Sequence, residues 1–190
     1  LHSLRRRQRQ MCIRDRYSAK ETLNIMQRLY ESHKVLTYPR TDSRYITTDV
    51  ADTLKERLKA CSVGPYRKLA GSLSMRPIRK NASFVDNKKV TDHHAIIPTE
   101  QFVDLQTMTN EERKVYDLVV RRFLAVLLPA FEYDQTVFTG GLAGESFTAK
   151  GKIVKSQGWK EAYENLETDE EWEEADDLAA VSYTHLRAHE

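Results

Sequence analysis

The sequence predicts an α+β fold in which helices come first and strands follow. Capping boxes and apolar residues at helical spacing fill residues 17–128, and an alternating strand pattern fills residues 131–156. Pro129 lies between the two patterns and predicts the boundary, because proline ends a helix. We therefore expect a helical domain over residues 17–128 and a partial β-rich domain over residues 131–166.

The first helix is predicted to follow a capping box. Ser18 and Glu21 have the required spacing, in which each side chain satisfies a backbone N–H group of the other residue. We expect this helix to end near residues 32–34. The apolar residues at helical spacing are Leu23, Met26, Leu29 and Tyr30.

A second helix is predicted between a cap at Thr47 or Thr48 and a stop at residues 64–65, where Gly-Pro breaks the pattern. Residues 71–92 are polar and interrupted by Pro77, which predicts a loop with short elements. The apolar stripe of the second helix is Val50, Leu54, Leu58 and Cys61.

The last helix and the strands complete the pattern. Thr109 and Glu112 form another capping box, and Pro129 ends the stripe Val115, Val119, Phe123 and Val126. The alternation of residues 131–137 predicts a strand, and residues 145–154 predict one or two more. The glycines expected to supply turns are Gly140, Gly141 and Gly144.

The two ends do not share these patterns. Residues 1–16 and 181–190 lack a helical or strand period and are interpreted as non-native extensions, so they are excluded from the fold prediction. A basic nucleic-acid arm at residues 5–9 is the alternative for the first end. Residues 167–180 are predicted to be an acidic linker, with a carboxylate metal site as the alternative.

Charge is unevenly distributed along the 190 residues. The net charge is +2, but residues 17–160 carry +7 from 23 Lys/Arg and 16 Asp/Glu, which favours a polyanionic partner. No apolar run is long enough to cross a bilayer, so no membrane partner is expected. The two cysteines have neither disulfide nor zinc-ligand spacing, which makes a reducing, cytoplasmic setting the default.

One short motif, LTYPRTDSR at residues 36–44, combines a phenol with an arginine two residues later. Pro39 favours an extended backbone at Tyr38, and residues two apart in an extended segment face the same side. Tyr38 can then act as a nucleophile on a phosphate whose oxygens Arg40 binds. From spacing alone, a packed tyrosine in a proline turn is the favoured interpretation. Thr41, Asp42 and Ser43 can order the loop or contact a nucleic-acid backbone.

A second motif, VTDHHAIIPT at residues 90–99, holds two adjacent histidines. His93 and His94 point in different directions on a helix or a strand, so one metal site using both is not expected. A histidine beside a phosphate can donate a hydrogen bond or supply positive charge. The alternative, favoured from the motif alone, is a pair satisfied by backbone groups or by Asp92.

Several motifs in order resemble type IA DNA topoisomerases, and the Y-P-R-T-D-S form resembles the bacterial topoisomerase III branch. LTYPRTDS resembles the active-site motif, and DHHAIIPT about fifty residues later resembles the second motif. The resemblance covers about residues 17–166, and it reverses the preference for structural roles. Five further stretches that follow the family in order are SAKETLNIMQRLYE, TNEERKVYDLVVRRFLA, FEYDQTVFT, GESFTAKGKIV and GWKEAY.

The resemblance implies a role for each matching residue. Tyr38 would be the nucleophile that forms a phosphotyrosine bond to a 5′ DNA end, Arg40 would stabilise the transferred phosphoryl group, and His93 would be the active-site histidine. Residues 17–128 would form a helical, winged-helix-like domain carrying the tyrosine, and residues from about 131 would begin a β-rich arch. The residues expected to contact DNA are Thr41, Asp42, Ser43, Arg44 and His94.

The resemblance also implies what lies outside this sequence. The family's Toprim domain supplies an acidic Mg²⁺ site, and nothing here resembles it. We therefore expect that Mg²⁺ belongs to the intact enzyme, that this stretch binds no metal, and that it cannot relax DNA alone. The implied substrate is single-stranded or underwound DNA, the reaction needs no ATP, and the implied location is the bacterial cytoplasm at the nucleoid.

Two other classes of protein stay open from the sequence. One is a winged-helix-like nucleic-acid binding module in which Tyr38 is structural. The other is a structural interaction protein that uses the acidic residues near the end of the chain.

Overall fold

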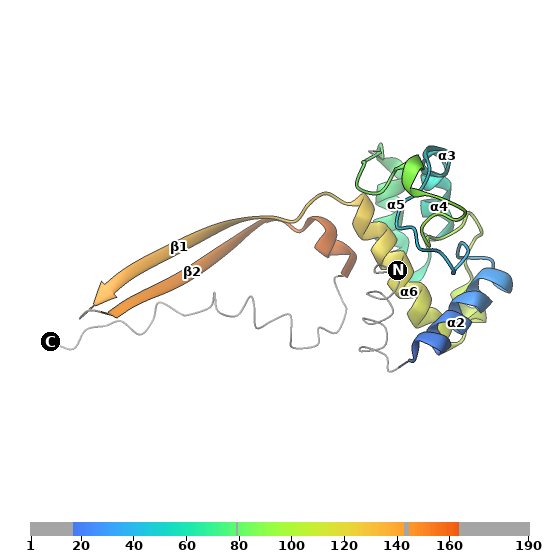
Figure 1. Cartoon of the computed structure of the whole chain (residues 1–190), viewed down its shortest axis with the longest axis horizontal. Helices are drawn as coiled ribbons and strands as arrows, with labels where there is room; N and C mark the ends of the chain where they lie inside the picture. The colour runs from blue at the N-terminus through green and yellow to red at the C-terminus, as the bar shows by residue number, and fades with distance from the viewer. Residues whose placement is uncertain (1–16, 79, 143–144, 164–190) are drawn as a thin grey trace. The chain divides into compact units, whose positions relative to one another are not determined.

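A computed structural model of the chain describes residues 17–78, 80–142 and 145–163. The described residues form helices followed by one antiparallel pair of strands, which confirms the predicted α+β class (Figure 1). The chain divides into two compact units between Leu128 and Pro129. The predicted extensions at residues 1–16 and 181–190 and the predicted acidic linker lie outside the described residues.

Helix α2 spans Ala19–Glu31, and its predicted capping box is confirmed. The Ser18 hydroxyl accepts from the Glu21 N–H at 3.2 Å, and the Glu21 carboxylate accepts from the Ser18 N–H at 2.7 Å. The buried face is Thr22, Ile25, Met26 and Leu29. The predicted stripe was therefore partly wrong, since Leu23 is half-buried and Tyr30 is exposed.

The predicted second helix is two short helices, α3 at Thr48–Asp52 and α4 at Leu54–Ala60. The break lies at Thr53, whose hydroxyl donates to the Val50 carbonyl at 3.0 Å. Such a side-chain bond to the backbone competes with helical hydrogen bonding, which accounts for the break. The predicted core residues Leu54, Leu58 and Cys61 are buried.

Helix α5 spans Arg67–Met75 and corrects the loop prediction for residues 71–75. A 3₁₀ turn at Gly64–Tyr66 leads directly into it, and Ala70 and Leu73 are buried on one face. Gly71 and the polar residues around it hide this short apolar period in the sequence.

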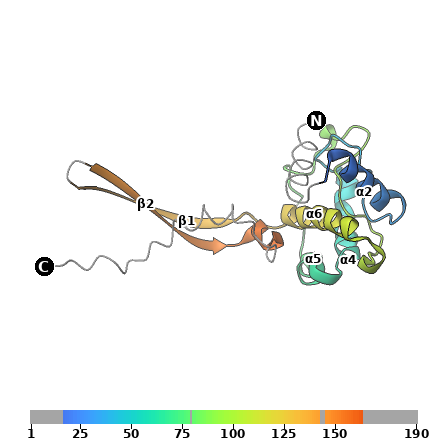
Figure 2. The same cartoon turned by 90° about the horizontal axis from the view of Figure 1, so that it is seen from below.

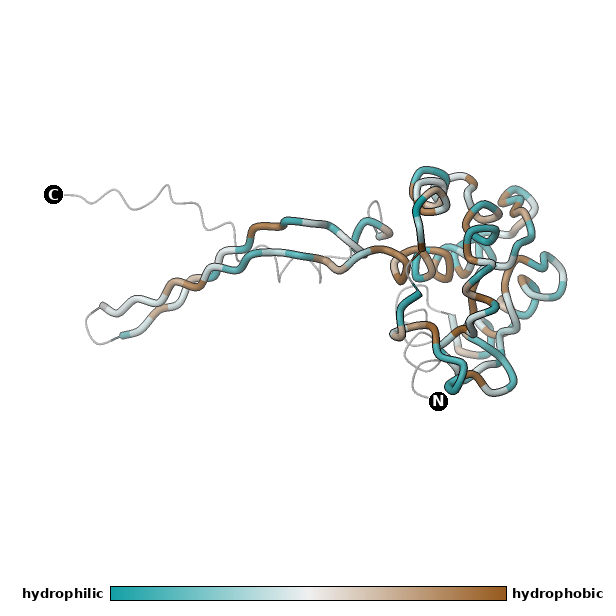
Figure 3. Tube along the Cα trace, turned by 90° about the horizontal axis from the view of Figure 1, so that it is seen from above, coloured by the Kyte–Doolittle hydropathy of each residue, from teal (hydrophilic) through white to brown (hydrophobic). Residues whose placement is uncertain are grey.

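Helix α6 spans Asn110–Leu127 and begins with the predicted capping box. The Thr109 hydroxyl accepts from the Glu112 N–H at 3.2 Å, and the Glu112 carboxylate accepts from the Thr109 N–H at 2.9 Å. Helices α2 and α5 both contact α6 (Figure 2). Hydrophobic residues recur at intervals along these helices (Figure 3). The buried residues of α6 include Val115, Tyr116, Val120, Phe123 and Leu124.

The second unit contains a ribbon of two antiparallel strands, β1 at Glu132–Leu142 and β2 at Glu145–Ser156. Residues 145–154 therefore form one strand. Gly140 and Gly141 were predicted to form a turn, but they lie in β1 opposite Phe147 and Ser146. A Cβ at Gly140 would lie 2.5 Å from the Phe147 ring, so the glycine makes room for that ring.

The helices found in the described part of the chain are all too short or too polar to cross a membrane.

Candidate active site

The two sequence motifs lie side by side in the first unit. Leu36 and Pro98 form an antiparallel bridge, and the Thr37 N–H donates to the Ile97 carbonyl at 3.0 Å. The Thr37 hydroxyl accepts from the Ile97 N–H at 3.0 Å and donates to the Ala95 carbonyl at 3.2 Å. Thr37, which directly precedes Tyr38, is therefore held against residues 90–99, which we call the histidine segment.

Tyr38 and His93 are in direct contact. Their ring centroids are 4.3 Å apart, with an angle of 38° between the planes. The edge-to-face contact of Tyr30 with Tyr38, at 5.5 Å between centroids, holds the phenol from the end of α2. The Thr41 hydroxyl donates to the His93 carbonyl at 2.9 Å, which ties the two segments together 52 residues apart in sequence.

Burial alternates along the tyrosine motif. Pro39 and Thr41 are buried, whereas Tyr38 is half-buried and Arg40 and Asp42 are exposed. This alternation agrees with the extended backbone expected beside Pro39, and it puts Tyr38 and Arg40 on the solvent side of the segment.

Tyr38 and Arg40 keep their polar ends available. Within residues 17–78, 80–142 and 145–163, neither the Tyr38 hydroxyl nor the Arg40 guanidinium makes a hydrogen bond or ion pair. A phenol and a guanidinium on one solvent-facing edge can both reach a phosphate. This arrangement is the chemical core of the candidate site.

The hydroxyls after Arg40 mainly order the loop. Thr41 accepts from the Ser43 N–H at 3.1 Å, and the Ser43 hydroxyl donates to the Lys89 carbonyl at 2.9 Å. The Ser43 hydroxyl also accepts from the Tyr45 N–H at 3.1 Å. These bonds favour loop ordering for Thr41 and Ser43, and contact of either residue with DNA stays a prediction.

His94 differs from its neighbour. Its Nδ1 is hydrogen-bonded to the Ala95 carbonyl oxygen at 2.7 Å, and the residue is half-buried. For His94, this agrees with the alternative interpretation, in which a backbone group satisfies the histidine. Nδ1 must carry the proton in this bond because a carbonyl oxygen only accepts. His93 is exposed, and its ring contacts Tyr38.

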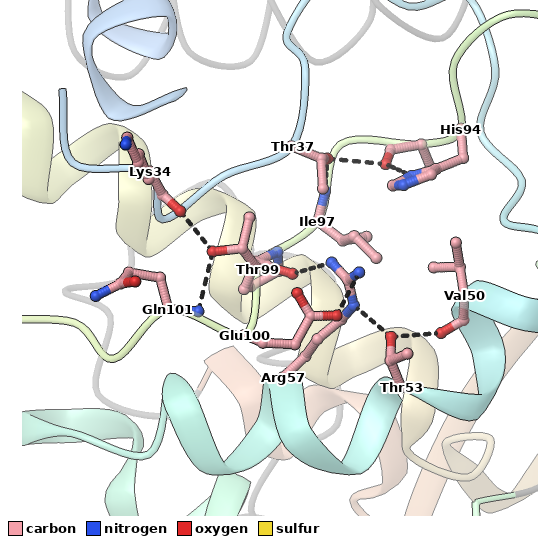
Figure 4. A network of polar contacts seen from close by, with 12 residues as sticks. Lys34, Thr37, Val50, Thr53, Arg57, His94, Ile97, Thr99, Glu100 and Gln101 are labelled. Atoms are coloured by element: carbon pink, nitrogen blue, oxygen red, sulfur yellow. Dashed lines mark hydrogen bonds and ion pairs between the residues drawn. The ribbon is translucent and has the colours of Figure 1, made fainter. Parts of the chain in front are cut away.

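Arg57, on helix α4, anchors the histidine segment. This residue was not identified from the sequence. Its guanidinium donates to the Pro98 carbonyl at 2.8 Å, pairs with Glu100 at 2.7 Å, and bonds the Thr53 hydroxyl at 2.8 Å (Figure 4). Burial lowers the pKa of Arg57, and the ion pair with Glu100 opposes that shift. An arginine three residues after Leu54, on the apolar face of a helix, is the sequence feature that points to it.

Glu112 ties α2 to α6 and was identified from the sequence only as a cap. Its buried carboxylate pairs with Arg28 at 2.9 Å and with His33 at 3.3 Å. Burial raises the pKa of Glu112, but the bonds from Arg28 and the Thr109 N–H, together with His33, outweigh it and lower the pKa to about 2. This contact fixes the helix that leads to Tyr38.

The described residues do not fit a magnesium site. Within them, no group of three or more His, Cys, Asp or Glu side chains gathers closely enough to hold a metal ion. Mg²⁺ needs several oxygen ligands around one point. The chemistry proposed for these residues therefore uses no metal that they hold.

Comparison with known proteins agrees with the motifs. The family model described as DNA topoisomerase matches residues 3–186. The chain is 62% identical over 155 residues to DNA topoisomerase 3 of a Bacillus cereus strain. The aligned residues are 82% of this chain and 21% of that protein. It is 49% identical over 174 residues to DNA topoisomerase 3 of Bacillus subtilis (strain 168). That alignment spans 92% of this chain and 24% of the Bacillus subtilis protein.

The chain therefore spans about a fifth to a quarter of the length of these relatives. The match extends well beyond the tyrosine and histidine motifs and includes all of the described residues. The chain belongs to the type IA DNA topoisomerase family and is similar to bacterial DNA topoisomerase 3.

Proposed function

We propose that Tyr38 is the nucleophile of a DNA topoisomerase that cuts and reseals one DNA strand. The observation that carries the proposal is the contact between Tyr38 and His93, which joins the two motifs beside the exposed Arg40. A structural tyrosine needs neither a solvent-facing hydroxyl nor an exposed arginine two residues later.

The proposed step is a transesterification. The Tyr38 phenol loses its proton, and its oxygen attacks a phosphorus atom of the DNA backbone. A bond forms between phosphorus and the tyrosine oxygen, while the bond to the 3′ oxygen breaks and that oxygen takes up a proton. The product is a 5′-phosphotyrosine, and the reverse reaction reseals the strand. The phosphotyrosine retains the energy of the broken ester, so no ATP is needed.

Arg40 and His93 are proposed to act on the phosphoryl group. An arginine fork can bind two phosphate oxygens and offset the charge that grows during transfer. His93 can donate a hydrogen bond to a phosphate oxygen, because its ring lies against the Tyr38 ring and its edge faces solvent. Thr41, Asp42, Ser43, Arg44 and His94 are proposed to contact or shape the DNA strand.

The wider protein is proposed to supply the remaining parts. Residues 17–128 would form the winged-helix-like domain that carries Tyr38, and the ribbon would begin the β-rich arch. A Toprim domain elsewhere in the protein would hold Mg²⁺, so this stretch alone would not relax DNA. The proposed substrate is single-stranded or underwound DNA, in the bacterial cytoplasm at the nucleoid.

The test uses a full-length protein in which this chain replaces the matching stretch of the Bacillus cereus relative. With Mg²⁺, the chimaera should relax supercoiled plasmid, and Tyr38→Phe should abolish relaxation and the covalent DNA adduct. Tyr133→Phe, which alters a half-exposed tyrosine of the ribbon, is the matched control and should relax normally. Relaxation by Tyr38→Phe at the unaltered rate would show that Tyr38 is not the nucleophile.

A second measurement separates catalysis from docking at Arg40. Arg40→Ala should lower cleavage of a single-stranded oligonucleotide at least ~100-fold while changing its affinity by less than about fivefold, since the arginine acts on the developing charge. Equal losses in cleavage and affinity would instead make Arg40 a docking residue, as in the binding-module alternative.

A further inference from the structure

Two cations contact Tyr45, which lies on the same loop as Tyr38: Arg44 from that loop, and Lys89 from the separate 3₁₀ turn Asn87–Lys89. The Arg44 guanidinium donates to the Tyr45 hydroxyl at 3.0 Å and lies 5.2 Å from the centre of its ring. The Lys89 ammonium lies 4.5 Å from the same centre and 3.5 Å from the same hydroxyl. Arg44 is exposed and the Lys89 side chain is 54% exposed.

We propose that Arg44 and Lys89 form a second phosphate clamp, positioned by Tyr45, that holds the DNA backbone a few nucleotides from the phosphate attacked by Tyr38. The proposal rests on the DNA-cleaving function proposed above. The chemistry that the clamp recognises is a phosphodiester, an anion that can lie between two cations. Tyr45 is a positioning residue, because the tyrosine holds the two cations and makes no phosphate contact of its own.

The contacts explain how two like charges are kept together. Two cations side by side repel each other, but the negative face of the Tyr45 ring and its hydroxyl oxygen attract both. The Asp86 carboxylate also pairs with the Lys89 ammonium at 3.0 Å and offsets part of its charge. The hydrogen bond from Arg44 lowers the pKa of Tyr45, and that from Lys89 acts in the same direction.

Donors remain after these contacts are counted. Guanidinium and ammonium groups each carry more N–H donors than the bonds to Tyr45 and Asp86 use. Those donors are on exposed side chains and can bind phosphate oxygens. The cluster is therefore held by its own contacts while keeping capacity for an anion.

The backbone fixes the cluster relative to the nucleophile. The Ser43 hydroxyl bonds the Tyr45 N–H and the Lys89 carbonyl, and the Ala95 N–H donates to the Tyr45 carbonyl at 2.8 Å. Tyr45 follows Tyr38 by seven residues, so the two lie at most about 25 Å apart along an extended chain. At about 3.4 Å per stacked nucleotide, the clamp lies within about seven nucleotides of the attacked phosphate.

The test measures binding of single-stranded oligonucleotides to the full-length chimaera by fluorescence anisotropy across a salt series. Arg44→Gln and Lys89→Gln should each weaken binding severalfold and lower the salt slope by about 0.7, the value for one lost phosphate contact on a single strand. Lys55→Gln removes the same charge from the exposed side of α4 and is the matched control, for which the slope should not change.

Neutral methylphosphonate linkages placed singly along the oligonucleotide then locate the clamp. One linkage within about seven nucleotides of the cleavage site should weaken binding to the unaltered protein about fivefold, and should have no effect on the Arg44→Gln/Lys89→Gln double variant. Tyr45→Leu should lose the same linkage effect although it removes no charge, and Tyr45→Phe, which keeps the ring, should restore most of it.

The outcomes separate the two proposals. If the unaltered protein and the double variant give the same methylphosphonate profile, the clamp does not exist, whereas relaxation dependent on Tyr38 still supports the proposed function. If the unaltered chimaera fails to bind single-stranded DNA at low salt, the proposed function fails and the clamp fails with it. Because the methylphosphonate scan needs no substitution to detect a contact, a misfolded Tyr45→Leu variant leaves the test decisive.

Discussion

The helical unit and the β-ribbon use apolar residues in opposite ways. In the helical unit, Leu29 and Leu58 are fully buried, and hydrophobic residues of several helices meet in one core. In the ribbon, Phe138 is 60% exposed and Ile153 is 69% exposed, and both strands are exposed along almost their whole length. Within the described residues, β1 and β2 pair with each other, and most of the side chains on both of their faces are exposed.

The difference explains where a chemical site can be built. A catalytic side chain is held in a precise position only where its neighbours are packed and hydrogen-bonded. The loops around Tyr38 meet this condition, because Thr37, Thr41 and Arg57 each hydrogen-bond a backbone carbonyl of the histidine segment. An isolated two-stranded ribbon is marginally stable in water. All of the candidate site residues accordingly lie in the helical unit.

The largest expected effect of a single substitution comes from the core. Leu58→Ala should lower the free energy of unfolding by about 3 kcal/mol, because it leaves a cavity at a site with no exposed surface. Ile153→Ala in the ribbon should change it by less than about 0.5 kcal/mol. Urea unfolding followed by far-ultraviolet circular dichroism measures both. Equal effects would mean that the ribbon is buried against another part of the protein.

Removing the Arg57 anchor should cost less than removing a core leucine. Arg57→Met should lower the free energy of unfolding by about 2 kcal/mol, because the Pro98 carbonyl loses its hydrogen-bond partner. Arg67→Met, at an exposed position of α5, is the matched control and should be neutral. In the chimaera, Arg57→Met should also slow cleavage, because the histidine segment is no longer held. Unaltered unfolding would mean that the buried network contributes no net stability.

Acid should weaken the helical unit through Glu112. The folded-state pKa of about 2 lies below the ordinary value of 4.5, so the carboxylate stabilises the fold above about pH 4.5. That stability is lost as the pH falls from about 4.5 through about 2, by on the order of 2 kcal/mol. Glu112→Gln should flatten this part of the pH profile of the unfolding free energy. A profile equally steep in both proteins would assign the acid sensitivity to other carboxylates.

The helix cap at Ser18 should have the smallest effect that remains measurable. Ser18→Ala removes the hydroxyl that accepts from the Glu21 N–H and should lower the free energy of unfolding by about 1 kcal/mol. Ser146→Ala, in the exposed strand β2, provides the comparison and should change it by less than about 0.5 kcal/mol. If the two substitutions have the same effect, the capping box does not stabilise α2.

Local chemistry made several features predictable. The capping boxes at Ser18 and Thr109 were confirmed because both partners lie within one helical turn. The strand alternation after Pro129 was likewise visible in the sequence. In contrast, α5 was missed because its short apolar face is interrupted by Gly71 and by serines. The glycines at residues 140–141 suggested a turn, but their pairing in β1 depends on space for the Phe147 ring.

In the candidate site, too, some features were predictable from the local sequence and others depend on tertiary contacts. The sequence by itself determined the residue types, with Tyr38 and Arg40 two positions apart around a proline and two histidines in a separate motif, since these depend only on order along the chain. Only the tertiary structure decided that His93 and not His94 meets the Tyr38 ring, that Arg57 anchors the histidine segment, and that Lys89 joins Arg44 at Tyr45. Those contacts depend on backbone pairing between distant segments, and no local pattern encodes the partner of such a pair.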